Sequence, residues 1–347
     1  MDRIDFRSDT VSWPTPAMRA AMAQAQVGDD VYGEDPTVNE LEALAAAKTG
    51  MEAGLFVASG TMGNLTAILT HAQRGEAAIV GLDAHTFAHE AGGMAALGGI
   101  VPYPLPTDEH GRFSLTEIEA ALPLDDPHYA PVSLILVENS YGAKGGYPLP
   151  PDYFADIRRI ANQHNLNVHM DGARLFNAAA ALNLTASEIT QNVDSVTFCL
   201  SKGLCAPVGS VLCGSADFIN RARRTRKLLG GGMRQAGILA AAGIISLNEM
   251  TERLVDDHQH ARHLAEGLSA IPGIALDYEV QTNMVFFSLS DELPITPDAF
   301  LDDLRTEANI WLGSTGGRSF RAVTHYWIGE EEVELFLQTA RSVIGNQ

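Results

Sequence analysis

The chain has 347 residues, more than one hydrophobic core usually organises, so we expect two domains. Hydrophobic residues make up 46% and charged residues 19%, which is typical of a folded globular protein and excludes disorder as the main state. The net charge of −20 argues against nucleic acid or an anionic membrane as a partner.

The N-terminal segment and the cysteines predict a cytoplasmic location. The N-terminal segment carries charges but no apolar run, so we expect no signal peptide, and no stretch is long and apolar enough to span a membrane. Cys199, Cys205 and Cys213 are an odd number without CxxC spacing, which favours neither a disulfide framework nor a zinc site. This usage is typical of a reducing compartment.

Strand and helix signals alternate through the first two-thirds of the chain. In chain order we expect a helix at 17–25, a helix at 38–48, a strand at 54–58, a helix at 61–73, strands at 78–82, 100–105 and 133–137, a helix at 151–164, and strands at 167–170, 195–200 and 210–213. This alternation predicts an α/β fold with a mainly parallel, helix-covered sheet.

The pattern of strand and helix signals changes near residue 245. Beyond it we expect a helix at 258–267, a strand at 284–289, a helix at 297–308, a strand at 320–325 and a helix at 331–344. The sequence therefore predicts a large domain over 1–245, with an N-terminal arm, and a smaller α+β domain over 246–347.

Lys202 is the first residue that suggests chemistry. The chain has only four lysines against nineteen arginines, and Lys202 directly follows the buried strand predicted at 195–200. A lysine that loses water at the end of such a strand becomes a nucleophile toward carbonyl groups. The alternative is a lysine in an exposed loop.

Asp171 ends another predicted strand, at the carboxyl edge where open α/β sheets bind ligands. A buried carboxylate there requires a cationic partner, and the protonated ring nitrogen of pyridoxal phosphate would provide one. The alternative is an aspartate that caps the turn at Gly172. Lys202 and Asp171 together therefore favour pyridoxal phosphate as the cofactor.

Two weaker signals agree with this interpretation. In Ser59-Gly60-Thr61, the glycine permits a tight turn and the free amides of a helix start can bind a phosphate. His85 follows a predicted strand and could stack on a pyridine ring. His85, His89 and Glu90 could instead form a metal site, because residues four apart share a helix face. We expect no metal, because no further ligand cluster is evident.

Several long motifs carry a family resemblance that runs from Ile4 to the end of the chain. They are RSDT at 7–10, VGDDVYGEDP at 27–36, SGTMGN at 59–64, HMDGARLFNA at 169–178, LSKG at 200–203 and GGMRQ at 231–235. Together they closely resemble the low-specificity L-threonine and L-allo-threonine aldolases. The resemblance implies the aspartate-aminotransferase fold type of pyridoxal-phosphate enzymes and a tetramer built as a dimer of dimers.

The implied reaction is the reversible cleavage of L-threonine, L-allo-threonine and other L-β-hydroxy-α-amino acids to glycine and an aldehyde. A β-eliminating lyase or an aminotransferase on the same fold would keep Lys202 and Asp171, and release of glycine would distinguish the aldolase. A catalytically inactive homologue is a further alternative, which the intact Lys202, Asp171, Arg174 and Arg321 argue against.

The resemblance also implies roles for individual residues around the cofactor. Lys202 matches the lysine that forms the Schiff base, and Asp171 matches the partner of the pyridine nitrogen. The remaining cofactor-binding positions are Gly60 and Thr61 at the phosphate, His85 over the ring, Arg174 beside Asp171, and Arg234 and Lys227, which reach the phosphate of a neighbouring subunit.

A second group of positions concerns the substrate. Ser8, Arg174 and Arg321 match groups that hold the substrate carboxylate, and His128 matches a histidine near the substrate hydroxyl. His85 and His128 are therefore the candidates for the catalytic base, and Tyr32 is a further candidate for substrate contact. One segment departs from the family, since the chain has Ser140-Tyr141-Gly142 where such enzymes often have Thr-His-Asn. The missing histidine leaves the role of this loop open.

Overall fold

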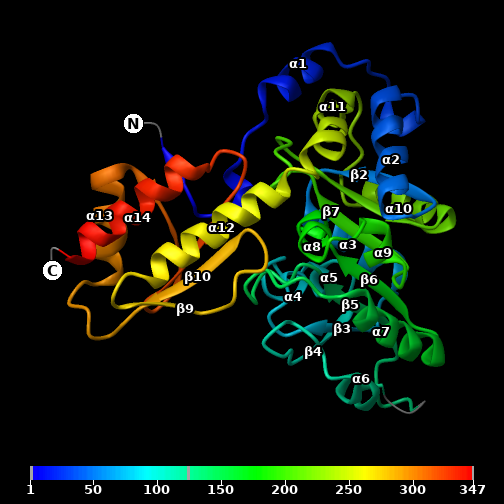
Figure 1. Ribbon diagram of the computed structural model, residues 1–347. Coiled ribbons are helices and arrows are strands. Elements are labelled where there is room, and N and C mark those ends of the chain that lie inside the picture. Colours follow the sequence, from blue (N-terminus) through cyan, green and yellow to red (C-terminus); the bar gives the residue numbers. More distant parts are fainter. Residues whose placement is uncertain (1–2, 123–125, 346–347) are drawn as a thin grey trace.

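The computed structural model describes residues 3–122 and 126–345, and Figure 1 shows an α/β domain joined to a smaller one. The strands of the larger domain are β2 (Ala53–Val57), β3 (Ala77–Gly81), β4 (Val101–Leu105), β5 (Val132–Glu138), β6 (Asn167–Asp171), β7 (Ser195–Cys199) and β8 (Ser210–Gly214). They form one sheet in the order β2-β8-β7-β6-β5-β3-β4. Only β8 runs antiparallel to its neighbours, so the predicted α/β fold with a mainly parallel sheet is confirmed.

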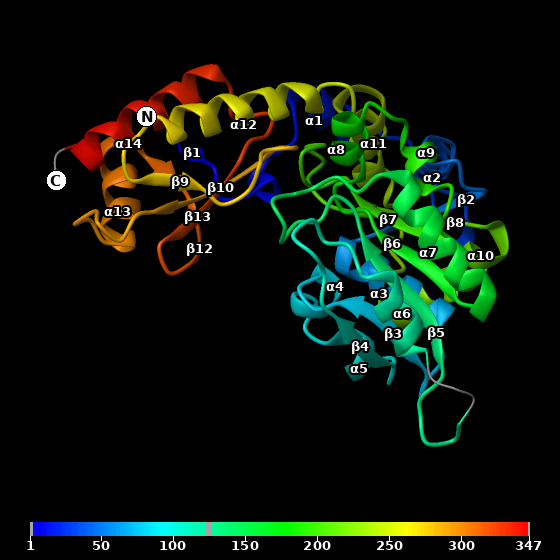
Figure 2. The same ribbon diagram turned by 60° about the horizontal axis from the view of Figure 1, so that its bottom comes forward.

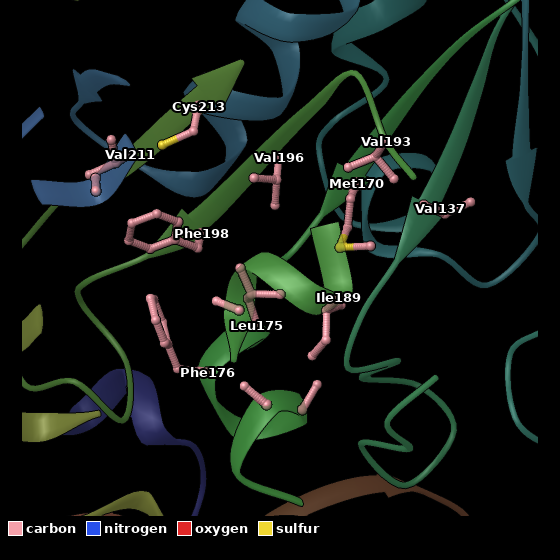
Figure 3. Packing of buried hydrophobic residues seen from close by; sticks show 14 of the residues in the cluster. Val137, Met170, Leu175, Phe176, Ile189, Val193, Val196, Phe198, Val211 and Cys213 are labelled. Carbon is pink, nitrogen blue, oxygen red and sulfur yellow. The ribbon is translucent and has the colours of Figure 1, made fainter. Parts of the chain in front are cut away.

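Helices cover both faces of this sheet. One face carries α2 (Pro36–Thr49), α6 (Leu115–Ala121), α7 (Pro151–His164), α8 (Leu175–Leu182), α9 (Ala186–Thr190) and α11 (Gly237–Ile245), and the other carries α3 (Gly60–His71), α5 (Gly93–Ala96) and α10 (Ala216–Leu228). Successive strand residues alternate between the two layers: Val137 faces the cluster of Figure 3, and Leu136 faces the opposite one. The central strands are therefore buried on both sides.

The smaller domain has a core of its own. Its antiparallel sheet has the order β12-β13-β10-β9, and its elements are α12 (Leu254–Ser269), β9 (Ile274–Leu276), β10 (Met284–Leu289), α13 (Pro297–Ala308), β12 (Gly313–Gly316), β13 (Ser319–Val323) and α14 (Glu330–Gly345). Phe287, Phe300 and Phe320 pack at the centre of this core. Helix α12 leads from the large domain into the small one (Figure 2).

The N-terminal residues pack in this second core. Strand β1 (Ile4–Asp5) pairs in parallel with β11 (Ile310–Trp311), and the fully buried ring of Phe6 lies 5.0 Å from that of Phe336. The chain then returns to the large domain, where α1 (Pro16–Gln24) packs against α11. The domain boundary at residue 245 stays a prediction.

Most expected elements lie within a few residues of their observed bounds, and α7, β10 and α13 match them. Helix α12 begins four residues earlier than expected, at Leu254. Helix α11 was not expected, because its sequence GILAAAGII has no polar face and therefore no helical periodicity. Within the described residues, no helix is both long and apolar enough to cross a membrane.

Candidate active site

A cavity of about 390 Å³ lies at the carboxyl ends of four parallel strands. Lining residues lie at the end of each strand or just after it: Asp83, His85 and His89 after β3, Glu138, Ser140, Gly142 and Ala143 at and after β5, Asp171, Ala173 and Arg174 at and after β6, and Lys202 after β7. The small domain closes the cavity with Phe286, Thr315 and Arg321. This edge of the sheet is where open α/β folds bind ligands.

Five of the residues predicted from the sequence meet in this cavity, namely Lys202, Asp171, His85, Arg174 and Arg321. The turn that carries Lys202 is fixed by its own carbonyl oxygen, which accepts hydrogen bonds from the Ser12 hydroxyl at 2.7 Å and from the Cys205 amide at 2.9 Å. The N-terminal arm therefore helps to hold the position of the lysine.

Asp171 presents a nearly buried carboxylate at the end of β6, with 3% of the residue exposed. Its Oδ1 accepts a hydrogen bond from the Ala173 amide at 3.0 Å, and its Oδ2 accepts one from Asn64 Nδ2 at 2.9 Å. No basic side chain pairs with Asp171 among the described residues. A buried carboxylate in this setting is suited to a cationic ligand group.

His85 is the first residue of the short helix α4 (His85–Ala88), and two glutamates fix it. Its amide donates to Glu138 Oε2 at 2.8 Å, and its Nδ1 lies 2.9 Å from Glu90 Oε1. The hydrogen bond with Glu90 raises the pKa of His85, although burial acts against it. Burial raises the pKa of Glu138 to about 7, and the charge of Asp171 acts in the same direction.

The ligand atoms of His85, Glu90 and Asp171 all lie within 4.8 Å of one another, which resembles a metal site. The metal alternative drawn from the sequence placed His89 in this cluster instead of Asp171. Helix α4 is a single turn that ends at Ala88, so His89 lies outside the cluster. The amide of Asn64 donates to both carboxylates, which accounts for their closeness without a cation.

Two arginines, Arg174 and Arg321, also line the cavity. Arg174 donates to both carboxylate oxygens of Asp9, from Nε at 2.8 Å and Nη2 at 2.6 Å. Arg321 donates from Nη2 to the Arg7 carbonyl at 3.1 Å, while its buried Nε has no partner among the described residues. Because Asp9 balances only one of the two guanidinium charges, these two arginines keep a net positive charge that suits an anion.

Helix α3 contacts the cavity wall through Asn64, which donates to Asp171, and the start of this helix fits a phosphate. Ser59 caps the helix by accepting from the Met62 amide, which leaves other amides of the first turn open to an anion. A side chain at Gly60 would place its Cβ 2.8 Å from Cys199 Sγ, so only glycine fits here. Thr61 is exposed at the helix start.

Other predicted residues do not reach the cavity within one chain. The Ser8 hydroxyl accepts from the Thr10 amide as the cap of η1 (Asp9–Val11). Tyr32 is 75% exposed on η2 (Asp30–Tyr32), Arg234 pairs with Asp29, and Lys227 lies in the last turn of α10.

His128 lies apart from His85 within one chain, so its role near the substrate hydroxyl stays a prediction. Its side chain is 85% exposed and pairs with Asp126. His128 precedes β5, so it lies at the amino edge of the parallel sheet, whereas the cavity lies at the carboxyl edge. Seven residues of strand separate the two edges by roughly 20 Å. One chain therefore does not bring His128 and His85 together.

The loop that departs from the family pattern supports the cavity wall. Tyr141 is buried, and its hydroxyl donates to Asp83 Oδ1 at 2.9 Å, while Lys144 pairs with the other oxygen. Although burial opposes it, the hydrogen bonds from Lys144 and Tyr141 lower the pKa of Asp83. The neighbouring Ser140 lines the cavity, and its buried hydroxyl has no partner among the described residues.

One family model matches most of the chain. The model of the beta-eliminating lyases matches residues 5–291. Among solved structures, the threonine aldolase of Leishmania major superposes with a TM-score of 0.83 at 22% identity, covering 98% of this chain and 99% of that one. An alanine–glyoxylate aminotransferase from Nostoc superposes with a TM-score of 0.75 at 18% identity, covering 98% and 95%. The predicted aspartate-aminotransferase fold type is confirmed.

Curated relatives are closer in sequence. The low specificity L-threonine aldolase of Escherichia coli is 43% identical over 95% of this chain and 96% of its own length. The low-specificity L-threonine aldolase 1 of Arabidopsis thaliana is 42% identical over 97% of this chain and 95% of its own length. The chain therefore belongs to the low-specificity L-threonine aldolase family, within the beta-eliminating lyases, and the resemblance seen in its motifs is confirmed.

Proposed function

We propose that the chain is a pyridoxal-phosphate-dependent lyase that cleaves L-threonine, L-allo-threonine and related L-β-hydroxy-α-amino acids to glycine and an aldehyde. One observation carries the proposal: Lys202, Asp171, Arg174 and Arg321 line a single cavity at the carboxyl edge of the sheet. A nucleophilic amine, a buried carboxylate and two guanidinium groups are the set that this cofactor and an amino acid require.

The residues present fit pyridoxal phosphate. Lys202 would bind its carbonyl carbon, Asp171 would face its ring nitrogen, and the start of α3 at Gly60 and Thr61 would take its phosphate. When bound, the cofactor supplies an electron sink for the pair of electrons released at Cα. The flat ring of His85 would lie against the pyridine.

Arg174 and Arg321 would hold the substrate carboxylate. A guanidinium group matches a carboxylate in two parallel hydrogen bonds, which fixes orientation as well as position. Asp9 occupies the Nε and Nη2 edge of Arg174, so Nη1 remains to face the cavity. Fixing the carboxylate fixes the direction of the Cα–Cβ bond, which must align for cleavage.

His85 is the proposed base for the β-hydroxyl proton. Its Nδ1 is engaged by Glu90, so Nε2 is the ring nitrogen left to take a proton, directly or through water. His128 would serve this role only if it reached the cavity of a neighbouring chain. The preference between threonine and allo-threonine would then be decided across a subunit contact.

The proposed assembly is a tetramer built as a dimer of dimers. Apolar side chains are exposed around the glycine-rich turn that precedes Arg234, including Val31, Tyr32, Leu228 and Ile238, and we call this set the arm patch. Gly232 lies against Val31 and Lys227, and Arg234 pairs with Asp29, so the glycine-rich turn packs against the segment that carries Val31 and Tyr32. A second chain seated here would receive Arg234 and Lys227 near its phosphate site.

The expected location is the cytoplasm, which the three buried free cysteines support, and the expected partners are amino acids rather than nucleic acid or membrane. Incubation with L-threonine tests the function. We expect equal amounts of glycine and acetaldehyde. Ammonia and a keto acid would instead indicate a β-eliminating lyase, and transfer of the amino group to a keto acid would indicate an aminotransferase.

A further inference from the structure

Asn64 lies between the two carboxylates beside the cavity. It is 1% exposed on α3, and its Nδ2 donates one hydrogen bond to Asp171 Oδ2 and one to Glu90 Oε1, both at 2.9 Å. One amide group therefore uses both of its protons to hold two acids close together. Burial raises the pKa of Glu90 and the charge of Asp171 acts in the same direction, while the hydrogen bonds from His85 and Asn64 favour its charged form.

The carbonyl side of Asn64 joins a network of polar groups that is buried at His169 and Ser195 and partly buried at His71. Its Oδ1 lies 3.2 Å from His169 Nε2, and the Ser195 hydroxyl lies 2.8 Å from both His169 Nδ1 and His71 Nε2. The fold produces this alignment directly. His169 stands two residues before Asp171 on β6, so both side chains face α3, and Asn64 and His71 are seven residues apart on one face of that helix.

The chemistry of each atom fixes the direction of the hydrogen bonds in this network. Burial lowers the pKa of His169 to about 3 and that of His71 to about 4, so each ring carries a single N–H. The carbonyl oxygen of Asn64 only accepts, which places the His169 proton on Nε2. Ser195 must then donate to His169 Nδ1 and accept from His71. Every donor in this network thus points toward the two carboxylates.

Glu90 extends the hydrogen-bond network to His85. Its Oε1 accepts from Asn64 and also lies 2.9 Å from His85 Nδ1. A carboxylate in this position holds the proton of the ring on Nδ1 and keeps the ring in one orientation. The same network therefore reaches both the carboxylate that would face the cofactor and the histidine that would take the substrate proton.

We propose that Asn64 and Glu90 are positioning residues for the reaction. Asn64 holds the Asp171 carboxylate in place for the cofactor, and Glu90 fixes the ring of His85 so that Nε2 is its basic atom. The inference rests on the proposed function, because only a bound pyridoxal phosphate gives Asp171 and His85 these roles. His71, Ser195 and His169 keep the Asn64 amide oriented.

The test compares Asn64→Leu and Glu90→Gln with two matched controls. Thr66→Val alters a fully buried α3 residue whose hydroxyl has no partner among the described residues, and Glu42→Gln alters a buried glutamate paired with Arg223. In the first measurement, each apoprotein is titrated with pyridoxal phosphate and binding is read from the absorbance. We expect Asn64→Leu to bind pyridoxal phosphate about 10- to 100-fold more weakly, because Asp171 loses one hydrogen bond to a charged group. Both controls should bind as the wild type does.

The second measurement is the pH profile of kcat/KM. In Glu90→Gln the acidic limb should move to lower pH, because His85 loses the hydrogen bond that contributes most to its raised pKa, while burial and Lys202 still lower that pKa and Asp171 still raises it. Binding of pyridoxal phosphate should stay near the wild-type value. An unmoved acidic limb would overturn the role of Glu90, and unchanged cofactor affinity in folded Asn64→Leu would overturn that of Asn64.

If Asn64→Leu does not fold, Ser195→Ala should weaken binding of pyridoxal phosphate in the same direction, and unchanged affinity in that variant contradicts the proposal. A wild-type protein that binds no pyridoxal phosphate would overturn the proposed function itself.

Discussion

Asp9 and Arg174 form a bidentate ion pair that joins the N-terminal arm to the cavity wall, with Nε–Oδ2 and Nη2–Oδ1 distances of 2.8 and 2.6 Å. Asp9 is fully buried. Although burial alone would raise the pKa of Asp9, the charge and hydrogen bonds of Arg174 lower it well below its usual range. The stability that this carboxylate contributes is therefore present above the pKa of the unfolded chain and is lost only in strong acid.

Asp9→Asn should strongly destabilise the protein, because it leaves the buried Arg174 without a counter-charge. Breaking one side of a buried pair costs about 3–5 kcal/mol. Urea unfolding at neutral pH measures the change. Asp302→Asn is the matched control, since its pair with Arg305 is exposed and should contribute less than about 1 kcal/mol. Equal effects in the two variants would contradict the assigned importance of the buried pair.

Lys202→Ala should abolish turnover and leave the fold intact. With its amine removed, the protein should lose the cofactor adduct that borohydride traps, although pyridoxal phosphate can still bind without a covalent bond. Lys48→Ala, at the end of the Ala-rich helix α2, should retain both activity and adduct. Peptide mapping of the reduced protein decides the point, and an adduct on Lys48, Lys144 or Lys227 would show that Lys202 is not the anchor.

Arg321→Lys should raise KM by about 10- to 100-fold, because a point charge replaces a planar fork that grips a carboxylate with two bonds. Steady-state kinetics with L-threonine measure the effect. Arg341→Lys provides the comparison, since this arginine is exposed on α14. If kcat/KM stays at the wild-type value in both variants, Arg321 does not bind the substrate carboxylate.

Partly buried His71 predicts a loss of stability in mild acid. The pKa of His71 is lowered by burial to about 4, so the unfolded chain takes up a proton below its ordinary value of 6.5 while the folded protein does not. Stability is therefore lost as the pH falls from about 6.5 toward 4. Between pH 7 and pH 5, His71→Gln should lose about 1–2 kcal/mol less than the wild type. Unfolding curves at the two pH values give the comparison, and parallel losses would disprove the assignment.

The arm patch predicts dependence on a second chain. Leu228 is 82% exposed beside Lys227, and Leu228→Glu should place a charge in the contact and favour the monomer. Sedimentation should show dissociation, and the cofactor should bind more weakly because Arg234 and Lys227 no longer reach it. Val208→Glu alters an exposed apolar residue outside the patch and should change neither property. A wild-type monomer with full activity would contradict the proposed assembly.

Those site residues that end strands could be predicted from the sequence. Lys202 and Asp171 follow runs of buried strand residues, and the parallel sheet brings such ends together. The position of His128 could have been judged in the same way, because it precedes a predicted strand and therefore belongs to the opposite edge. Its assignment came from the resemblance alone, which does not distinguish one chain from its neighbour.

The supporting residues could not be predicted in this way. In the sequence, the polar residues Asn64 and Glu90 are equally compatible with an exposed surface. Asp9 belongs to an N-terminal arm, so its sequence position does not reveal that it contacts the cavity wall. Glu90 contacts His85 only five residues away, but the contacts from Asn64 to Glu90 and Asp171 and from Asp9 to Arg174 span 26 to 165 residues, so only the packed fold reveals them. Glu138 carried one local signal, since it closes a strand of buried apolar residues.

The pairing of Ile4 with Ile310 also constrains how the molecule is made. During synthesis from the amino end, the segment that includes Phe6 leaves the ribosome long before β11 and Phe336 exist to receive it. The small core therefore cannot close until almost all of the described chain has been synthesised. A contact of such high sequence separation is slow to form, and until then the apolar ring of Phe6 stays open to chaperones or to aggregation.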